Sequence, residues 1–246
     1  FYDGTMSYDE DFTYWMLKFD SSENADRDHR DPKGLPRVEY IYSVIARRCG
    51  IQMPETDVLE DGDDFHFLIR RFDRHNSTDR LEKRHYGSWA GLAHAHRDST
   101  GAYSYEQLVM LARQMRLGQA AVTEIYRRAI FNIVGRNQDD HTKNVGFLMD
   151  KSGRWELAPA FDLTYAFDPI GKWTRHHQIR LNRKQDNFTC EDLLEFGRYC
   201  NLDDRISAEI LEKTIDAFSS FERLADDTGV SQELKATVSS HLRRQV

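Results

Sequence analysis

The densest polar cluster of the chain is Asn137-Gln138-Asp139-Asp140-His141-Thr142-Lys143-Asn144. It directly follows residues 119–134, where apolar side chains recur three or four positions apart and predict a helix. It directly precedes residues 146–157, where two short apolar stretches flank Lys151-Ser152-Gly153 and predict a hairpin. Asp162 stands eighteen residues beyond Asn144. The order of helix, polar loop, hairpin and carboxylate predicts that the loop and Asp162 form one site.

Phosphoryl transfer needs few chemical groups, and this chain supplies them in order. One carboxylate accepts the proton of the attacking hydroxyl, two oxygen ligands hold Mg²⁺, and a lysine steadies the phosphates of ATP. Protein kinases place the base and the first metal ligand on one loop, spaced Asp-x-x-x-x-Asn. Asp139 and Asn144 have this spacing, and Asp162 is the candidate second metal ligand. The pattern therefore predicts ATP and Mg²⁺ as cofactors.

Two further candidates lie far upstream of the polar loop. Residues 12–19 are aromatic and β-prone, so they predict a strand that carries Lys18, the candidate phosphate-binding lysine. An apolar series over 36–49 predicts an amphipathic helix that ends at Gly50. Glu39, at the start of that helix, is the candidate partner of Lys18. The predicted catalytic set is Asp139 with Lys18 and Glu39.

The rest of the pattern predicts an α+β protein with a small β-containing N-lobe and a larger, mainly helical C-lobe. Short strands are expected over 57–60 and 65–72, and a polar loop over 74–84. Helices are expected to dominate beyond Tyr103. Two of them are predicted to begin at capping boxes, Ser104 with Gln107 and Thr189 with Asp192, and two more are predicted over residues 207–225 and 232–244. The predicted lobes are residues 1–73 and residues 74–246.

Composition excludes several classes of protein. The chain has 246 residues, of which 39% are apolar and 30% charged, as in a globular protein with a sizeable core. No apolar run of about 18 residues occurs, so no membrane-spanning helix is expected. The net charge of −7 disfavours a protein whose main task is coating nucleic acid. Three cysteines without metal-ligand spacing fit a reducing cytosol, so a cytoplasmic protein is expected.

The chain resembles the HipA family of bacterial toxin kinases. Residues 130–144 look like the catalytic loop of that family, whose core is Asp-x-His-x-Lys-Asn, and residues 157–165 are similar to its metal-binding segment. Weaker matches are Val38-Glu39-Tyr40, Met53-Pro54, Arg71-Phe72-Asp73-Arg74, Trp89-Ala90-Gly91-Leu92 and residues 189–202. The resemblance covers nearly the whole chain, and the two catalytic segments are its most specific parts.

The resemblance implies a two-lobed protein-kinase-like fold, ATP, Mg²⁺ and a serine or threonine acceptor on a protein. In studied members that acceptor protein is an aminoacyl-tRNA synthetase. The resemblance also implies a partner, a HipB-like helix-turn-helix antitoxin that binds operator DNA, so that any DNA contact would be indirect. Phe72 and its adjoining backbone would line the adenine site, and His141 would lie near the nucleotide, the alternative for His141 being loop packing.

Other residues near the site have two interpretations each. Lys143 is expected to contact the transferring phosphate, as basic residues near such loops often do, or else to cap nearby carbonyls. Asp140 is adjacent to the predicted base, and neighbouring carboxylates in a loop point in different directions, so it is assigned no catalytic role. Trp173 is expected to be a packing residue rather than a stacking platform for bases.

One feature of the family is missing from the first residues. Residues 1–17 hold Gly4 as their one glycine, so they contain no Gly-rich phosphate loop before Lys18. In the family this loop carries a regulatory autophosphorylated serine and follows an N-terminal subdomain. Its absence suggests a truncated or cleaved chain.

Two other functions compete with an active kinase. A metal-dependent nuclease or phosphohydrolase would use Asp139, Asp140, His141 and Asp162 around one or two metal ions. A pseudokinase would bind an antitoxin or DNA without turnover. A nuclease has no use for Lys18, and pseudokinases often lack members of the catalytic set, which is complete here.

Overall fold

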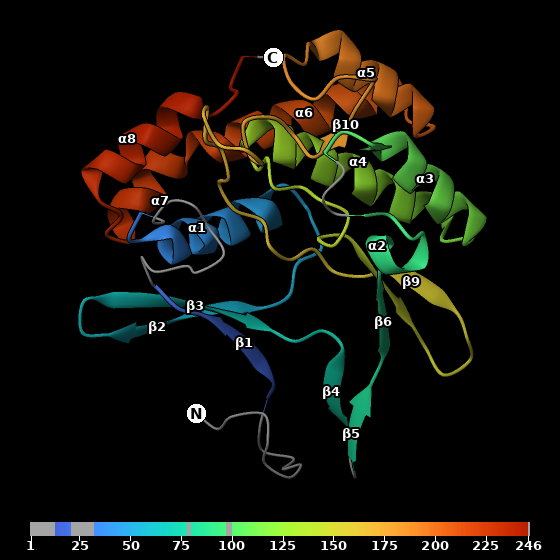
Figure 1. Ribbon diagram of the computed structural model, residues 1–246, viewed down its shortest axis with the longest axis horizontal. Helices are drawn as coiled ribbons and strands as arrows, with labels where there is room; N and C mark the ends of the chain where they lie inside the picture. The colour runs from blue at the N-terminus through green and yellow to red at the C-terminus, as the bar shows by residue number, and fades with distance from the viewer. Residues whose placement is uncertain (1–12, 21–31, 78–79, 97–99, 246) are drawn as a thin grey trace.

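The structure is a computed structural model, and it describes residues 13–20, 32–77, 80–96 and 100–245. The predicted lack of a Gly-rich loop falls mostly on residues 1–12, outside the described residues. Figure 1 shows small sheets on one side of the molecule and a larger helical part on the other. This arrangement agrees with the α+β class that the sequence predicts.

The first sheet has three antiparallel strands in the order β1-β3-β2. Their bounds are β1 (Trp15–Lys18), β2 (Thr56–Asp61) and β3 (Asp64–Arg70). β3 is central, and its middle is buried throughout, which suits its aromatic and branched side chains. The register pairs Lys18 with Phe67. The strand predicted over 65–72 ends at Arg70, so Phe72 lies beyond the sheet.

Helix α1 (Leu35–Arg48) lies between this sheet and the helical part (Figure 1). Pro36 occupies its first turn, where a missing backbone N–H costs nothing, and Gly50 follows its end with a φ of 80°. Tyr42 is fully buried, and its hydroxyl donates to the carbonyl of Gly135 at 2.6 Å. Its ring packs edge-on against Phe218 and Phe221. α1 therefore joins the sheet to the helical core.

Beyond α1, the described residues form seven more helices. Their bounds are α2 (Trp89–Leu92), α3 (Tyr105–Gln114), α4 (Gly118–Val134), α5 (Cys190–Tyr199), α6 (Asp204–Ser219), α7 (Phe221–Asp227) and α8 (Gln232–His241). Both predicted capping boxes are present, at Ser104 with Gln107 and at Thr189 with Asp192. No helix of the described ranges is long and apolar enough to cross a lipid bilayer.

Several strands were not predicted from the sequence. Residues 74–84, predicted as a loop, hold an antiparallel pair, β4 (Arg74–Ser77) and β5 (Arg80–Lys83). β6 (His85–Ser88) extends the correctly predicted hairpin of β8 (Gly146–Met149) and β9 (Trp155–Leu157) into a three-stranded sheet. β7 (Tyr103–Ser104) and β10 (Ile179–Arg180) form a short parallel pair. These strands are polar or very short, so they depend on their partners.

The helix predicted over 207–225 is two helices. It begins earlier, because Asp203 accepts the N–H of Ile206 at 2.8 Å and caps α6. It breaks at Ser220, whose hydroxyl donates back to the carbonyl of Ala217 at 2.7 Å. The last helix, predicted to reach Arg244, ends at His241.

Candidate active site

The polar loop after α4 is fastened to the segment that follows Asp162. Arg136 has a left-handed backbone with a φ of 53°, which reverses the chain at the end of the helix. The N–H of Gln138 donates to the carbonyl of Ala166 at 3.1 Å, and the N–H of Ala166 donates to the carbonyl of Arg136 at 3.1 Å. These two bonds fix the start of the loop against residues 163–166.

Asp139 and Asn144 lie at the two ends of a tight turn. The side-chain amide of Asn144 donates to the carbonyl of Asp139 at 3.0 Å, and its backbone N–H donates to the carbonyl of His141 at 2.9 Å. The Asp139 side chain is 26% exposed, so a substrate hydroxyl can reach its carboxylate. The predicted base and the predicted first metal ligand are thus neighbours in space.

Lys18, Glu39 and Asp162 converge from three separate elements. The Lys18 Nζ donates to Glu39 Oε1 at 2.6 Å and also to Asp162 Oδ1. Glu39 is 5% exposed and comes from α1, whereas Lys18 ends β1 and keeps 39% of its side chain exposed. Asp162 lies in the segment that follows β9. The lysine is therefore held between two carboxylates at the edge of the first sheet.

Burial and charge act differently on these three groups. Burial raises the pKa of Glu39 to about 7, although the charge of Lys18 lowers it. Burial would lower the pKa of Lys18, but Glu39 and then Asp162 outweigh burial and hold that pKa above its ordinary value. Burial would also raise the pKa of Asp162, yet Lys18 keeps it below its ordinary value. Asp162 is therefore the carboxylate that stays ionised.

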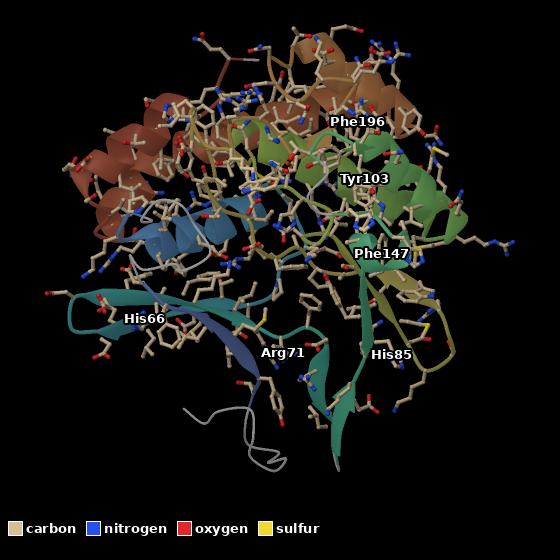
Figure 2. All side chains as sticks on the ribbon, in the orientation of Figure 1. His66, Arg71, His85, Tyr103, Phe147 and Phe196 are labelled. Atoms are coloured by element: carbon tan, nitrogen blue, oxygen red, sulfur yellow. The ribbon has the colours of Figure 1, made fainter. Side chains whose placement is uncertain are left out.

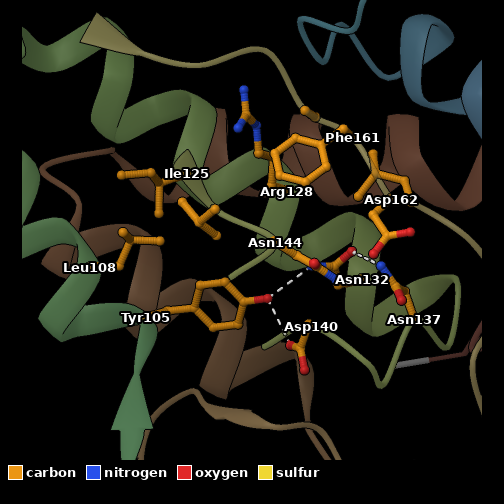
Figure 3. Close-up of a pocket in the computed structure, with 13 residues that line it drawn as sticks. Tyr105, Leu108, Ile125, Arg128, Asn132, Asn137, Asp140, Asn144, Phe161 and Asp162 are labelled. Atoms are coloured by element: carbon orange, nitrogen blue, oxygen red, sulfur yellow. Dashed lines mark hydrogen bonds between the residues drawn. The ribbon is translucent and has the colours of Figure 1, made fainter. Parts of the chain in front are cut away.

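Asp162 and Asn144, the two predicted metal ligands, lie close to one another. Both lie on the wall of one pocket, shown with Tyr105, Asn132 and Asp140 in Figure 3. Asp162 has a left-handed backbone with a φ of 56°, a conformation that a non-glycine residue adopts at a cost and that is common at functional sites. Mg²⁺ in kinases takes one or two protein oxygens and completes its shell with phosphate and water. An ionised Asp162 beside an Asn144 amide fits that requirement.

Phe72 lies in a cluster of three aromatic rings. Its ring centroid is 5.8 Å from that of Phe161 and 5.9 Å from that of Tyr86, and the last two are 6.2 Å apart. Phe161 directly precedes Asp162, so the cluster borders the candidate metal ligand. Tyr86 lies on β6, a strand that the sequence did not predict. Only a prediction of that strand could have placed Tyr86 beside Phe72.

The backbone beside Phe72 is braced by an ion pair. The guanidinium of Arg71 donates twice to Asp73, at 2.9 Å and 2.7 Å. Figure 2 shows Arg71 at the border of the first sheet, where the chain leaves β3 and crosses to β4. The bidentate pair stiffens this crossing, because an arginine fork fixes the geometry of its partner carboxylate.

His141 and Lys143 differ in their surroundings. His141 is 8% exposed, with Nε2 3.9 Å from Asp139 Oδ1, and its Nδ1 has no hydrogen-bond partner among the described residues. Lys143 is exposed, and within the described part of the chain it makes no hydrogen bond or ion pair with the other candidates. His141 therefore packs into the loop beside the base, whereas Lys143 points to solvent.

Asp140 is a hub of buried hydrogen bonds. Its Oδ2 accepts from the Tyr105 hydroxyl at 2.8 Å and lies 3.0 Å from His177 Nδ1, and its Oδ1 accepts from the N–H of Gln178 at 2.8 Å. Asp140 is 3% exposed. In Figure 3 the hydrogen bonds continue from Asp140 through the Tyr105 hydroxyl to the side-chain amide of Asn132. The side chain thus points into the core, away from its neighbour Asp139.

Comparison with known proteins agrees with this architecture. Over 142 residues the chain is 28% identical to the serine/threonine-protein kinase toxin HipA of Shewanella oneidensis. The aligned region covers 51% of this chain and 33% of that protein. This chain also matches a chain in the solved complex of Shewanella oneidensis HipA, HipB and operator DNA. The match has a TM-score of 0.68 at 17% sequence identity and covers 98% of this chain and 64% of the matched chain. The aligned part of this chain therefore spans about a third of the length of that curated relative.

A second solved structure shares the fold. The proinflammatory kinase CtkA of Helicobacter pylori matches with a TM-score of 0.61 at 14% identity, over 94% of this chain and 86% of that chain. Both structural matches agree with the predicted two-lobed, protein-kinase-like α+β fold. The family model described as the HipA-like C-terminal domain matches residues 4–221. Because that match covers most of the sequence, the chain belongs to the HipA-like C-terminal domain family.

Proposed function

We propose that this chain is the catalytic region of an ATP- and Mg²⁺-dependent serine/threonine protein kinase. The observation that carries the proposal is the contact of Lys18 with both Glu39 and Asp162, beside the turn that joins Asp139 to Asn144. A lysine, its carboxylate partner, a base and two oxygen ligands are the parts that kinases use. The proposed lobes are residues 1–73 and residues 74–246.

Each residue has one task in this proposal. Lys18, positioned by Glu39, binds the phosphates, and Phe72 with its adjoining backbone borders the adenine. Mg²⁺, when held by Asn144 and Asp162, offsets the negative charge of the phosphates. Asp139 accepts the proton of the acceptor hydroxyl while the oxygen of that hydroxyl attacks the γ-phosphorus. The bond from the γ-phosphorus to the bridging oxygen breaks, and its electron pair leaves with ADP.

The neighbours of the base have less direct tasks. His141, whose Nε2 lies 3.9 Å from Asp139 Oδ1, is proposed to lie near the nucleotide, as the resemblance to the family implies. Lys143 is exposed next to Asn144, so its ammonium is available to a phosphate. The nuclease alternative loses support, because Asp140, one of its four ligands, is already occupied by buried donors.

The family supports a proposal for the biological role. We propose that the kinase is the toxin of a HipA/HipB-like toxin–antitoxin system and that it acts in the cytoplasm on a translation-related protein such as an aminoacyl-tRNA synthetase. The Shewanella oneidensis relative was solved together with HipB and operator DNA. A HipB-like antitoxin is accordingly the proposed partner here, with operator DNA reached through it.

Calorimetry with ATP·Mg²⁺ tests the proposal on the full protein that carries this chain. The wild type should bind the nucleotide in a metal-dependent manner, and Asp162→Asn should lose the metal dependence. Lys18→Ala should weaken nucleotide binding as well, whereas a nuclease would keep its activity in that variant. A folded wild type that binds no nucleotide contradicts the kinase assignment.

A further inference from the structure

An exposed apolar and basic loop follows the candidate metal ligand. Residues 168–176 contain Ile170, which is 85% exposed, and Trp173, which is 42% exposed. Lys172 and Arg175 between and beside them are exposed as well. Trp173, predicted to be a packing residue, therefore keeps much of its side chain exposed. Ile170 and Trp173 thus expose apolar surface in the same short loop as two basic side chains.

The loop has a defined shape. Asp168 Oδ1 accepts the N–H of Ile170 at 3.0 Å, and the carbonyl of Asp168 accepts the N–H of Gly171 at 3.1 Å. The N–H of Asp168 in turn donates to the carbonyl of Thr174 at 3.4 Å. The two ends of the loop are thus closed on each other, and Ile170 is held at the tip.

Both ends of the loop are fastened to the polar loop that carries Asp139. On one side, Ala166 accepts the N–H of Gln138, and Ile170 is four residues further on, within about 14 Å along the chain. On the other side, the carbonyl of Trp173 accepts the side chain of Gln178, whose N–H is bound to Asp140. The exposed loop is therefore tied at both ends to the polar loop that carries the proposed base.

The chemistry of the tip favours a protein over a nucleic acid. The Lys172 ammonium lies 4.7 Å from the centroid of the Trp173 ring, so one face of that ring is covered and unsuited to base stacking. Ile170 offers an aliphatic surface that suits an apolar side chain. Lys172 and Arg175 give the tip positive charge in a chain of net charge −7. The one acidic residue of the loop, Asp168, is engaged by backbone.

We propose that residues 168–176 dock the protein substrate, through a segment of it in which acidic residues flank an apolar side chain near the accepted hydroxyl. The inference rests on the proposed kinase function, because it names the substrate class of the same site. Ile170 and the uncovered part of Trp173 receive the apolar side chain, and Lys172 and Arg175 pair with the acidic residues.

The test measures peptide binding apart from turnover. Two fluorescent peptides with the same serine and the same leucine differ in their flanking residues, which are Asp and Glu in one and Lys in the other. Anisotropy without nucleotide gives their affinities for the full protein. The wild type should prefer the acidic peptide, and Lys172→Glu with Arg175→Glu should weaken that peptide about tenfold or more and favour the basic one.

Two controls separate local charge from net charge and folding. Arg205→Glu with Arg223→Glu changes net charge equally on exposed positions of α6 and α7, and should leave the preference unchanged. Ile170→Ser should weaken both peptides without altering ATP·Mg²⁺ binding. Equal affinity of the wild type for both peptides overturns the docking proposal, even where nucleotide binding upholds the kinase. Binding of a single-stranded oligonucleotide in place of either peptide, lost in the charge-reversed loop, overturns it in favour of nucleic acid.

Discussion

Lys18 and Glu39 are 21 positions apart in the chain, and the Nζ of one lies 2.6 Å from the Oε1 of the other. One residue ends a strand and the other lies in the first turns of α1, so the contact fixes the sheet against the helix. Asp162 meets the same ammonium from the other side. The charge of each of these three groups therefore affects the pKa values of the other two.

The coupling predicts a pH-dependent stability. Burial raises the pKa of Glu39 to about 7, so the folded protein holds a proton there that the unfolded chain releases. Stability from this group is present at low pH and is lost as pH rises from the ordinary glutamate range through about 7. Glu39→Gln should therefore gain stability relative to the wild type over this window, by about 1–3 kcal/mol.

Urea unfolding at several pH values between 5 and 8 (about one unit apart) measures this difference. Glu55→Gln is the matched control, because the Glu55 side chain is 62% exposed and should show no such trend. A difference between the wild type and Glu39→Gln that stays constant with pH would show that Lys18, rather than burial, governs Glu39.

Asp139→Asn should stop phosphoryl transfer while sparing nucleotide binding. The amide cannot accept the proton of the acceptor hydroxyl, so kcat should fall by about 10²–10⁴. The carbonyl that Asn144 contacts belongs to the backbone and is retained, so the affinity for ATP·Mg²⁺ should change by less than about threefold. Transfer to casein and calorimetry measure the two quantities. Unimpaired transfer in a variant of verified sequence would remove Asp139 from the role of base.

Asp140→Ala should act on stability instead. The change leaves the Tyr105 hydroxyl and the N–H of Gln178 without their buried acceptor, and it removes the partner of His177. The free energy of unfolding should drop by about 3 kcal/mol or more, measured by urea titration. Asp57→Ala, an exposed carboxylate, is the control and should change it by less than about 0.5 kcal/mol. A stable Asp140→Ala protein that fails to bind metal would instead support the nuclease alternative.

Gly146→Ala should test the aromatic cluster. A β-carbon at Gly146 would lie 2.1 Å from the Tyr86 ring, so the ring must move away from Phe72 and Phe161. If the cluster borders the adenine, ATP affinity should fall by about three- to tenfold with the stability little changed, because Tyr86 is half-exposed and can swing outward. Calorimetry compares it with Gly91→Ala, whose β-carbon meets an ordinary contact at 3.5 Å. Equal affinities in the two variants would place the adenine elsewhere.

Much of the helical part could be predicted because its signals are local. The capping boxes at Ser104 and Thr189 use hydrogen bonds that span three residues, and each is written in the sequence at that spacing. The spacing of Asp139 and Asn144 is equally local, and the structure closes it into one turn. Helix ends were less certain, because Ser220 breaks a pattern that periodicity alone would continue.

The strands and the supporting residues could not be predicted so well. β4, β5 and β6 are polar, and a polar strand is recognised only by the partner that completes its hydrogen bonds. The sequence assigns Asp140 no catalytic role, but it does not show what the side chain binds, because its partners lie 35 or more positions away. Trp173 is predicted to be a packing residue, and only its position on a closed loop leaves it partly exposed.

The amino-acid sequence by itself determined the helices, the polar loop and the identities of the candidate catalytic groups, because these depend on contacts between residues a few positions apart. The tertiary structure decided which of them meet. Lys18 and Asp162 are separated by 144 positions, and their contact exists only because α1 holds the first sheet against the helical core. The pKa shifts that Lys18 and the two carboxylates impose on one another follow from that packing, since electrostatic coupling depends on distance and burial rather than on order in the chain.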